Sequence, residues 1–227
     1  MSERPNILFI TTDQQRWDCL SLYDTPGLHT PELDRLASEG LCFENAYCSS
    51  PLCIPSRVSM MSGQYPSRHG AHHLRSRIDF DFPTLPGILT TQGYHTAIIG
   101  KTHFVPREVE AAHVAGVERP DPLSQPDREY GDQAFWRSFD GPYLGFDHVR
   151  QMFGHSSERK PSEHYRVWLE DQGWDLAEMD SLHGKGGSSL WPAEGRSAGL
   201  WPLPEDAHQN AWMNDEAERN IRKQHGS

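Results

Sequence analysis

The first part of the chain consists of short apolar runs separated by amphipathic segments. Residues 6–12 (NILFITT) form a compact, β-branched run between Pro5 and Asp13, which predicts a buried strand of a parallel sheet. The runs at residues 41–47 and 94–99 predict two further strands. The first run is bounded by Pro5 and Asp13, and the last ends at Gly100.

The segments between these runs have helical patterns. Residues 30–40 begin with a threonine suited to an N-cap and a proline suited to the first turn, and they end at a glycine. Further helical segments are predicted at residues 58–61 and 84–93. Because strands and helices alternate, the predicted fold class is α/β.

The second half of the chain has a different texture. Residues 105–204 are rich in proline and contain a run of glycine and serine, so we expect a long irregular insertion. Within it, residues 145–149 predict a short strand and residues 162–171 a helix. Residues 205–223 predict a last helix with one apolar stripe that has no apparent packing partner.

Charge and composition limit the classes of function. The net charge is −11, so the chain lacks the cationic field expected of a protein that binds nucleic acid or anionic membranes. The apolar runs are too short for a secretory signal or a membrane span, and we expect cytoplasmic residence. All four cysteines lie before residue 54, where we expect reduced thiols. The Cys48–Cys53 spacing has no second pair, which disfavours zinc.

Three strand ends or loops offer groups suited to hydrolysis of an anionic ester. Asp13 directly follows the first predicted strand, where a carboxylate can bind a metal ion or cap a turn. Cys53 precedes a proline-initiated helix that carries Arg57, and both the helix end and the guanidinium favour negative charge. Lys101 and His103 follow the third predicted strand and can bind an anion and transfer a proton.

In combination these motifs resemble the sulfatase family of the alkaline phosphatase superfamily. The matching segments are, in family order, residues 5–13, 30–40, 53–57 (C-x-P-S-R), 62–70 and 100–103 (G-K-x-H). The resemblance implies an alkaline-phosphatase-like fold, with a mixed, largely parallel sheet sandwiched by helices. It identifies residues 1–227 as the amino-terminal part of a catalytic domain, with the core at 5–104, and leaves the fold incomplete on its C-terminal side.

The resemblance also implies a mechanism. Cys53 is oxidised by a maturation enzyme to Cα-formylglycine, and one hydroxyl of the hydrated aldehyde attacks the sulfur of a sulfate ester. The other hydroxyl then expels sulfate as the aldehyde re-forms. By the same carry-over, Asp13 and the modified Cys53 are metal ligands, Arg57 supports the formylglycine oxygens, Lys101 binds the sulfate oxygens and His103 contacts the diol.

Two departures from the family pattern qualify this picture. Gln14 stands where many relatives have a second aspartate, so its place beside the metal stays open. The second acidic pair that completes the family's metal site does not occur in this sequence, and Asp147 with His148 falls in a segment that the family uses structurally. A hard cation with oxygen ligands is expected, Ca²⁺ first, with Mg²⁺ or Mn²⁺ as alternatives. With this ligand set alone, we expect weak metal binding and little turnover.

The predicted function is therefore hydrolysis of a small-molecule or carbohydrate sulfate ester. A phosphonate monoester hydrolase or phosphodiesterase on the same scaffold is the alternative enzyme, although the Lys101-x-His103 pair favours sulfate. A catalytically inactive fragment that binds an anion or a partner is the alternative outside enzymes. The sequence leaves the oligomeric state and the leaving alcohol undetermined.

Overall fold

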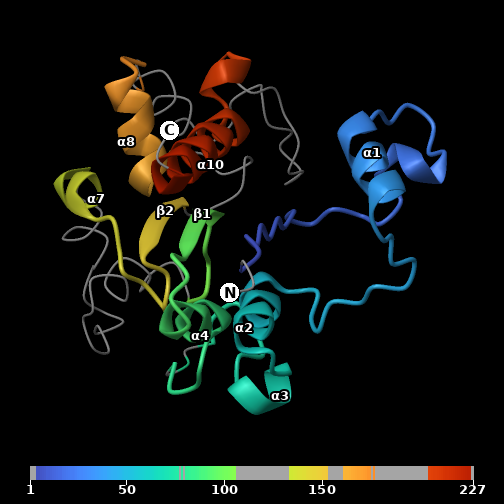
Figure 1. Ribbon diagram of the computed structural model, residues 1–227, viewed down its shortest axis with the longest axis horizontal. Coiled ribbons are helices and arrows are strands. Elements are labelled where there is room, and N and C mark those ends of the chain that lie inside the picture. The colour runs from blue at the N-terminus through green and yellow to red at the C-terminus, as the bar shows by residue number, and fades with distance from the viewer. Residues whose placement is uncertain are drawn as a thin grey trace. The chain divides into compact units, whose positions relative to one another are not determined.

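The computed structural model describes residues 4–76, 78, 80–105, 133–152, 161–174, 176 and 204–225. The chain divides into two compact units, Met1–Tyr47 and Cys48–Ser227, which are described separately below (Figure 1). None of the helices in the described ranges is both long and apolar enough to span a bilayer.

The first unit contains the helix predicted at residues 30–40. Helix α1 (Pro31–Glu39) follows a short 3-10 turn, η1 (Ser21–Tyr23), and ends at Gly40. Thr30 precedes α1, but its hydroxyl accepts from the amide of Ser21 (2.9 Å) rather than from the helix. Ser21 Oγ in turn donates to the carboxylate of Asp34 (2.7 Å), so side-chain hydrogen bonds join η1 to α1.

The two strands predicted in this unit are absent, which corrects the sequence analysis. Residues 6–12 and 41–47 have no strand assignment, and the structure describes no strand anywhere in 4–47. Their apolar side chains are exposed, Leu8 by 74% and Leu41 by 86%. An apolar run indicates that a segment suits burial, but a strand forms only where a second strand supplies the backbone hydrogen bonds.

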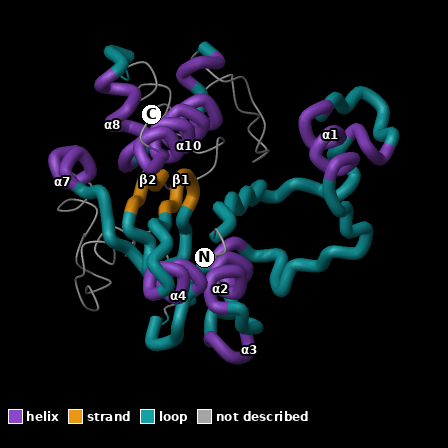
Figure 2. The backbone as a smooth tube through the Cα atoms, in the orientation of Figure 1, coloured by secondary structure: helices purple, strands orange, loops and turns teal. Residues whose placement is uncertain are grey.

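The second unit contains a two-stranded parallel sheet (Figure 2). Strand β1 (Ala97–Lys101) pairs with β2 (His148–Met152), with Ala97 opposite His148. The predicted strand at 94–99 is therefore shifted toward the C-terminus. The shift has a local cause, because the Thr96 amide donates to the Asp147 side chain (N to Oδ2, 3.0 Å) rather than to a backbone carbonyl. The Thr96 carbonyl accepts from the amides of Asp147 (2.9 Å) and His148 (3.0 Å), and the paired strand begins at the next residue, Ala97.

The region predicted to be an irregular insertion supplies the second strand. The strand lies at 148–152 rather than 145–149, because Tyr143 and Phe146 exchange two backbone hydrogen bonds of 2.9 Å and close a tight turn there. The same region contributes α7 (Gln133–Ser138) and the predicted helix α8 (Glu163–Asp171). Residues 106–132, 153–160, 175 and 177–203 of this region lie outside the described part of the chain.

Three helices follow the start of the second unit: α2 (Cys53–Ser62), α3 (Pro66–His69) and α4 (Leu85–Thr91). Helix α4 begins close to its predicted start, after Thr84, whose Oγ1 accepts from the Gly87 amide (3.2 Å) and donates to the Leu144 carbonyl (2.8 Å). The second of these bonds ties α4 to the turn that leads into β2. Helix α2 is longer than the segment predicted at 58–61.

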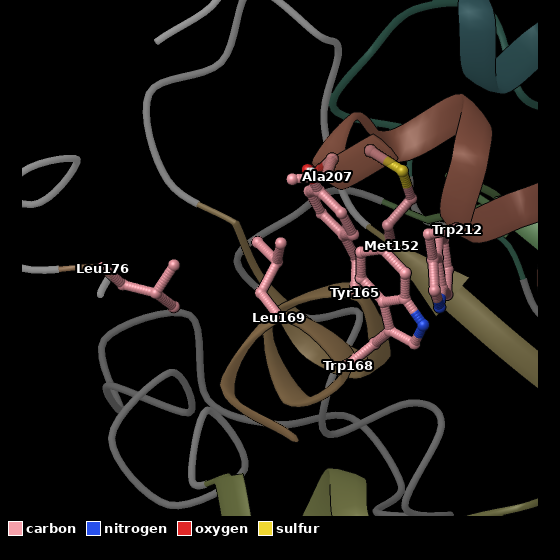
Figure 3. Close-up of a cluster of buried hydrophobic side chains, with 7 residues drawn as sticks. All are labelled: Met152, Tyr165, Trp168, Leu169, Leu176, Ala207 and Trp212. Atoms are coloured by element: carbon pink, nitrogen blue, oxygen red, sulfur yellow. Dashed lines mark hydrogen bonds between the residues drawn. The ribbon is translucent and has the colours of Figure 1, made fainter. Parts of the chain in front are cut away.

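The last helix, α10 (Gln209–His225), follows a 3-10 turn, η2 (Glu205–Ala207), close to the predicted bounds. The apolar stripe predicted for this helix, Met213, Ala217 and Ile221, does have a packing partner near its start, because Met213 packs against a cluster of buried side chains. Trp212 is fully buried in a cluster with residues of α8, β2 and η2 (Figure 3), whose buried members are Met152, Tyr165, Trp168, Leu169, Leu176, Ala207 and Trp212. Farther along, Ile221 is 47% exposed, so the packing covers only the first part of the stripe.

Candidate active site

The candidate nucleophile is the first residue of α2. Leu52 precedes the helix in an extended conformation, and its carbonyl accepts from the Ser56 amide (3.0 Å), which closes the first turn. Pro55 is compatible with that turn, since a proline nitrogen has no hydrogen to donate and the first amides have no acceptor within the helix. Cys53 is a half-buried free thiol in this structure. It therefore lies at the positive end of a helix dipole.

Packing on one face holds α2 in place. Ile54 and Val58 are fully buried and form a cluster with Ala71, against which Ile78 and two phenylalanines pack. The helix ends at Gly63, whose backbone is left-handed (φ +67°) and whose amide bonds the Ser59 carbonyl. The C-x-P-S-R signature is thus part of a helix fixed by its own apolar residues.

The cation predicted to bind sulfate lies beside the candidate nucleophile. Lys101 is the last residue of β1, and its Nζ is 3.7 Å from Cys53 Sγ. Arg57 is buried, and its Nη1 donates to the backbone carbonyl of Lys101 (2.7 Å). The packing of β1 beside α2 therefore brings Lys101 to Cys53 and Arg57, more than forty residues away in sequence, and it places an ammonium group where a developing negative charge would be stabilised.

The remaining predicted site residues are His103, which lies in the second unit, and Asp13 and Gln14, which lie in the first. His103 follows β1, half-buried, with a left-handed backbone (φ +49°). Asp13 and Gln14 belong to the first unit, in an exposed segment where Gln14 also has a positive φ of 54°. Their predicted role beside Cys53 stays a prediction.

The described residues do not by themselves make up an ion site. No group of three or more His, Cys, Asp or Glu side chains that could hold a metal ion occurs in the described ranges. Asp13 offers one hard carboxylate ligand, whereas Ca²⁺ takes six to eight oxygens. Asp147, the nearest sequence substitute for the missing acidic pair, accepts hydrogen bonds from Thr96 and so serves the sheet.

One buried polar pair next to the signature helix was not anticipated. Ser59 of α2 and His69 of α3 are 9% and 6% exposed, and Ser59 Oγ lies 2.9 Å from His69 Nε2. Burial, followed by the charge of nearby His72, lowers the pKa of His69. The sequence offered only the position of His69 between Arg68 and a glycine, which suits an anion contact or a turn equally well.

The chain is similar in sequence to known sulfatases. The sulfatase family model matches residues 5–173. An arylsulfatase of Clostridium perfringens is 39% identical over 104 residues, which cover 45% of this chain and 22% of that protein. An N-acetylglucosamine-6-O-sulfatase of Bacteroides thetaiotaomicron is 36% identical over 104 residues, covering 46% of this chain and 19% of that protein.

A solved structure shows the fold. The crystal structure of a phosphonate monoester hydrolase of Agrobacterium radiobacter superposes with a TM-score of 0.67 at 24% identity, over 96% of this chain and 38% of that one. This likeness confirms the predicted α/β class with a parallel sheet. The chain spans about a fifth of the length of the curated relatives described above. Because the family match takes in most of its residues, the chain belongs to the sulfatase family.

Proposed function

We propose that this chain carries the nucleophile and the sulfate-binding cation of a sulfuric ester hydrolase. The observation that carries the proposal is the 3.7 Å approach of Lys101 Nζ to Cys53 Sγ at the start of α2. Membership of the sulfatase family supports the reaction class. The rest of the catalytic apparatus is inferred from the family.

A sulfate group fits this position on electrostatic grounds. The first amides of α2 have no acceptor within the helix, and together with the helix dipole they favour an anion. Lys101 adds a full positive charge beside them. Since the chain as a whole carries a net charge of −11, attraction of an anionic ester requires such a local arrangement.

Arg57 is proposed to support the site in two ways. Its hydrogen bond to the Lys101 carbonyl holds the end of β1 against α2, which fixes the distance between the cation and Cys53. Its guanidinium has further donors, because a guanidinium carries five N–H groups. By family resemblance, these donors stabilise the oxygens of the modified Cys53, and His103 contacts the diol.

The proposed nucleophile is formylglycine made from Cys53. The family implies this modification, which supplies a hydrated aldehyde with one hydroxyl to attack sulfur and a second whose deprotonation expels sulfate. The residues that would hold a divalent cation, Ca²⁺ first, are Asp13 and the modified Cys53, with Gln14 as a third candidate, and such an ion would supply Lewis-acid chemistry there. The chain's own residues bind the sulfate oxygens and hold the nucleophile in position.

The proposed substrate class is a sulfated carbohydrate or a small sulfate ester. The N-acetylglucosamine-6-O-sulfatase relative supports the carbohydrate. The phosphonate monoester hydrolase neighbour keeps phosphonate hydrolysis as the second candidate. A formylglycine-generating or equivalent maturation enzyme is the proposed protein partner, and cytoplasmic residence is the proposed location.

Protection of Cys53 from alkylation tests the anion site in this chain. Inorganic sulfate is expected to slow alkylation of Cys53 by iodoacetamide, followed by peptide mass spectrometry. Alkylation of the exposed Cys42 should be unaffected and serves as the internal control. The variant Lys101→Met should lose the protection. Equal alkylation of Cys53 with and without sulfate would remove the proposed role of Lys101.

Turnover distinguishes the two enzyme candidates. In the matured protein that contains this chain, 4-nitrophenyl sulfate should be hydrolysed faster than an aryl phosphonate monoester. Cys53→Ala should abolish hydrolysis, whereas the matched Cys42→Ala variant should retain it. Faster phosphonate hydrolysis would favour the second candidate.

A further inference from the structure

The buried pair Ser59 and His69 has a hydrogen-bond pattern that fixes the state of the imidazole. The backbone amide of Ala71 donates to His69 Nδ1 (3.1 Å), and His69 Nε2 lies 2.9 Å from Ser59 Oγ. A backbone amide can only donate, so Nδ1 must carry a lone pair. The proton of the neutral ring is therefore on Nε2, and Nε2–H donates to Ser59.

This tautomer excludes one chemical reading of the pair. A histidine that activates a serine must accept the hydroxyl proton on the nitrogen that faces it. Here the nitrogen that faces Ser59 is already protonated. Ser59 and His69 are therefore not a nucleophile and its base.

The two bonds of His69 join both sides of the packing that holds α2. One bond reaches Ser59 on α2 itself, and the other reaches Ala71. The side chain of Ala71 belongs to the cluster that buries Ile54 and Val58 of α2. A single imidazole thus links the helix to the segment against which that helix packs.

We infer that His69 is a positioning residue that holds α2, and with it Cys53, only while its ring is neutral. The catalytic meaning of this inference rests on the proposed function, since it assumes that Cys53 becomes the nucleophile. The structural inference itself is independent of turnover.

Protonation of His69 would break the arrangement. A proton on Nδ1 would face the Ala71 amide, which is also a donor, and the charged ring would remain buried. A positive charge on the neighbouring His72 would repel a proton on the His69 ring and so opposes protonation of His69. On the packed face of α2, the charged residue Arg57 is engaged with the Lys101 carbonyl. The lowered pKa of His69 agrees with these contacts.

The sign of the pH effect follows from this shift. Because the folded pKa lies below the ordinary value of 6.5, the unfolded chain binds more protons in the interval between the two values. The stability contributed by the neutral ring is complete above 6.5. It is lost as the pH falls from 6.5 through the folded pKa.

Side-chain ¹⁵N NMR of the whole chain tests the tautomer directly. His69 should give the signature of a neutral ring with the proton on Nε2 at pH 7, and its titration midpoint should be lower than in the chain unfolded in urea. A ring with its proton on Nδ1, or a midpoint at or above the unfolded value, would overturn the inference.

Two variants separate the two bonds of the imidazole. His69→Gln can place an amide N–H near the position of Nε2 and does not titrate, whereas His69→Asn can replace only the Nδ1 acceptor. Hydrogen exchange of the α2 amides should be about tenfold faster in His69→Asn, because Ser59 loses its donor. In His69→Gln, exchange should stay near wild type at pH 7. After correction for intrinsic rates, its protection should not change between pH 7 and 5.

The readout at the nucleophile is alkylation of Cys53 relative to the exposed Cys42. The Cys53 to Cys42 ratio should rise at pH 5 in the wild type and stay constant in His69→Gln. A ratio with the same pH dependence in both proteins would show that His69 does not position Cys53. None of these measurements uses sulfate hydrolysis. The role of His69 can therefore be refuted while the proposed function holds, and the proposed function can be refuted while the role of His69 holds.

Discussion

Replacement of Gly100 by alanine tests how the end of β1 is built. Gly100 lies directly before Lys101, has φ +102° and sits where α10 approaches the strand. A Cβ built there would be 2.6 Å from Met213 Sδ. The variant therefore imposes two costs: a backbone conformation that L-residues rarely adopt, and displacement of Met213.

The magnitude follows from these two costs. An alanine held at this positive φ costs about 1–3 kcal/mol. Moving the flexible Met213 out of its rotamer adds about 1 kcal/mol. We expect Gly100→Ala to lower the free energy of unfolding by about 2–4 kcal/mol in urea denaturation followed by tryptophan fluorescence.

Two further variants isolate the contact with Met213. Gly173→Ala is the matched control, because Gly173 has φ +81° and nothing within 4 Å of an added Cβ. It should lose only the backbone component, about 1–2 kcal/mol. In the Met213→Ala background, Gly100→Ala should cost about 1 kcal/mol less than in the wild type. Equal costs in both backgrounds would refute the proposed packing of α10 on β1.

Two other predictions concern buried polar groups near α8. Tyr165→Phe removes a 2.7 Å hydrogen bond to the buried Ala207 carbonyl and should cost about 1–3 kcal/mol of unfolding free energy, while the exposed Tyr47→Phe should cost nothing measurable. Desolvation lowers the pKa of His164 from 6.5 to about 4, so stability should fall by up to about 3 kcal/mol as the pH drops from 6.5 to 4. The variant His164→Gln can still donate to the Phe139 carbonyl, and it should flatten the pH–stability curve between pH 6.5 and 4. An unchanged slope would show that His164 does not cause the loss of stability in this pH range.

Local signals in the sequence predicted α1, α4, α8 and α10, but they gave only part of α2 and missed α3 and α7. The cap and stop residues around 30–40 and 84–93 act within a few residues of themselves, and α1 and α4 begin where those signals indicated. The apolar pattern at 162–171 likewise predicted α8. Helix signals are local, so they can be read without knowledge of the tertiary structure.

Strands were predicted less well because their hydrogen bonds are made to distant residues. Residues 6–12 have the composition of a buried strand but are exposed in the structure. The pairing of β1 with 148–152 joins segments about fifty residues apart, and the Thr96–Asp147 bonds that set its start cannot be inferred from either segment alone.

In the candidate site, too, sequence motifs predicted some residues, whereas contacts that depend on tertiary packing were not predicted. The family motifs named Cys53, Arg57 and Lys101, and the structure brings these three together. The sequence did not reveal the pairing of Ser59 with His69, because one residue lies on α2 and the other on α3 after an intervening turn. The contact depends on how the two helices pack, which residue spacing does not specify.

The most direct test of the account is the chemical state of Cys53 in the matured protein. Peptide mass spectrometry across Cys53 should find a mass about 18 Da below that of the thiol peptide, because conversion of the CH₂–SH group to an aldehyde removes sulfur and two hydrogens and adds one oxygen. The peptide containing Cys42 should keep its thiol mass. An unmodified Cys53 in protein that hydrolyses sulfate esters at full rate would contradict the account.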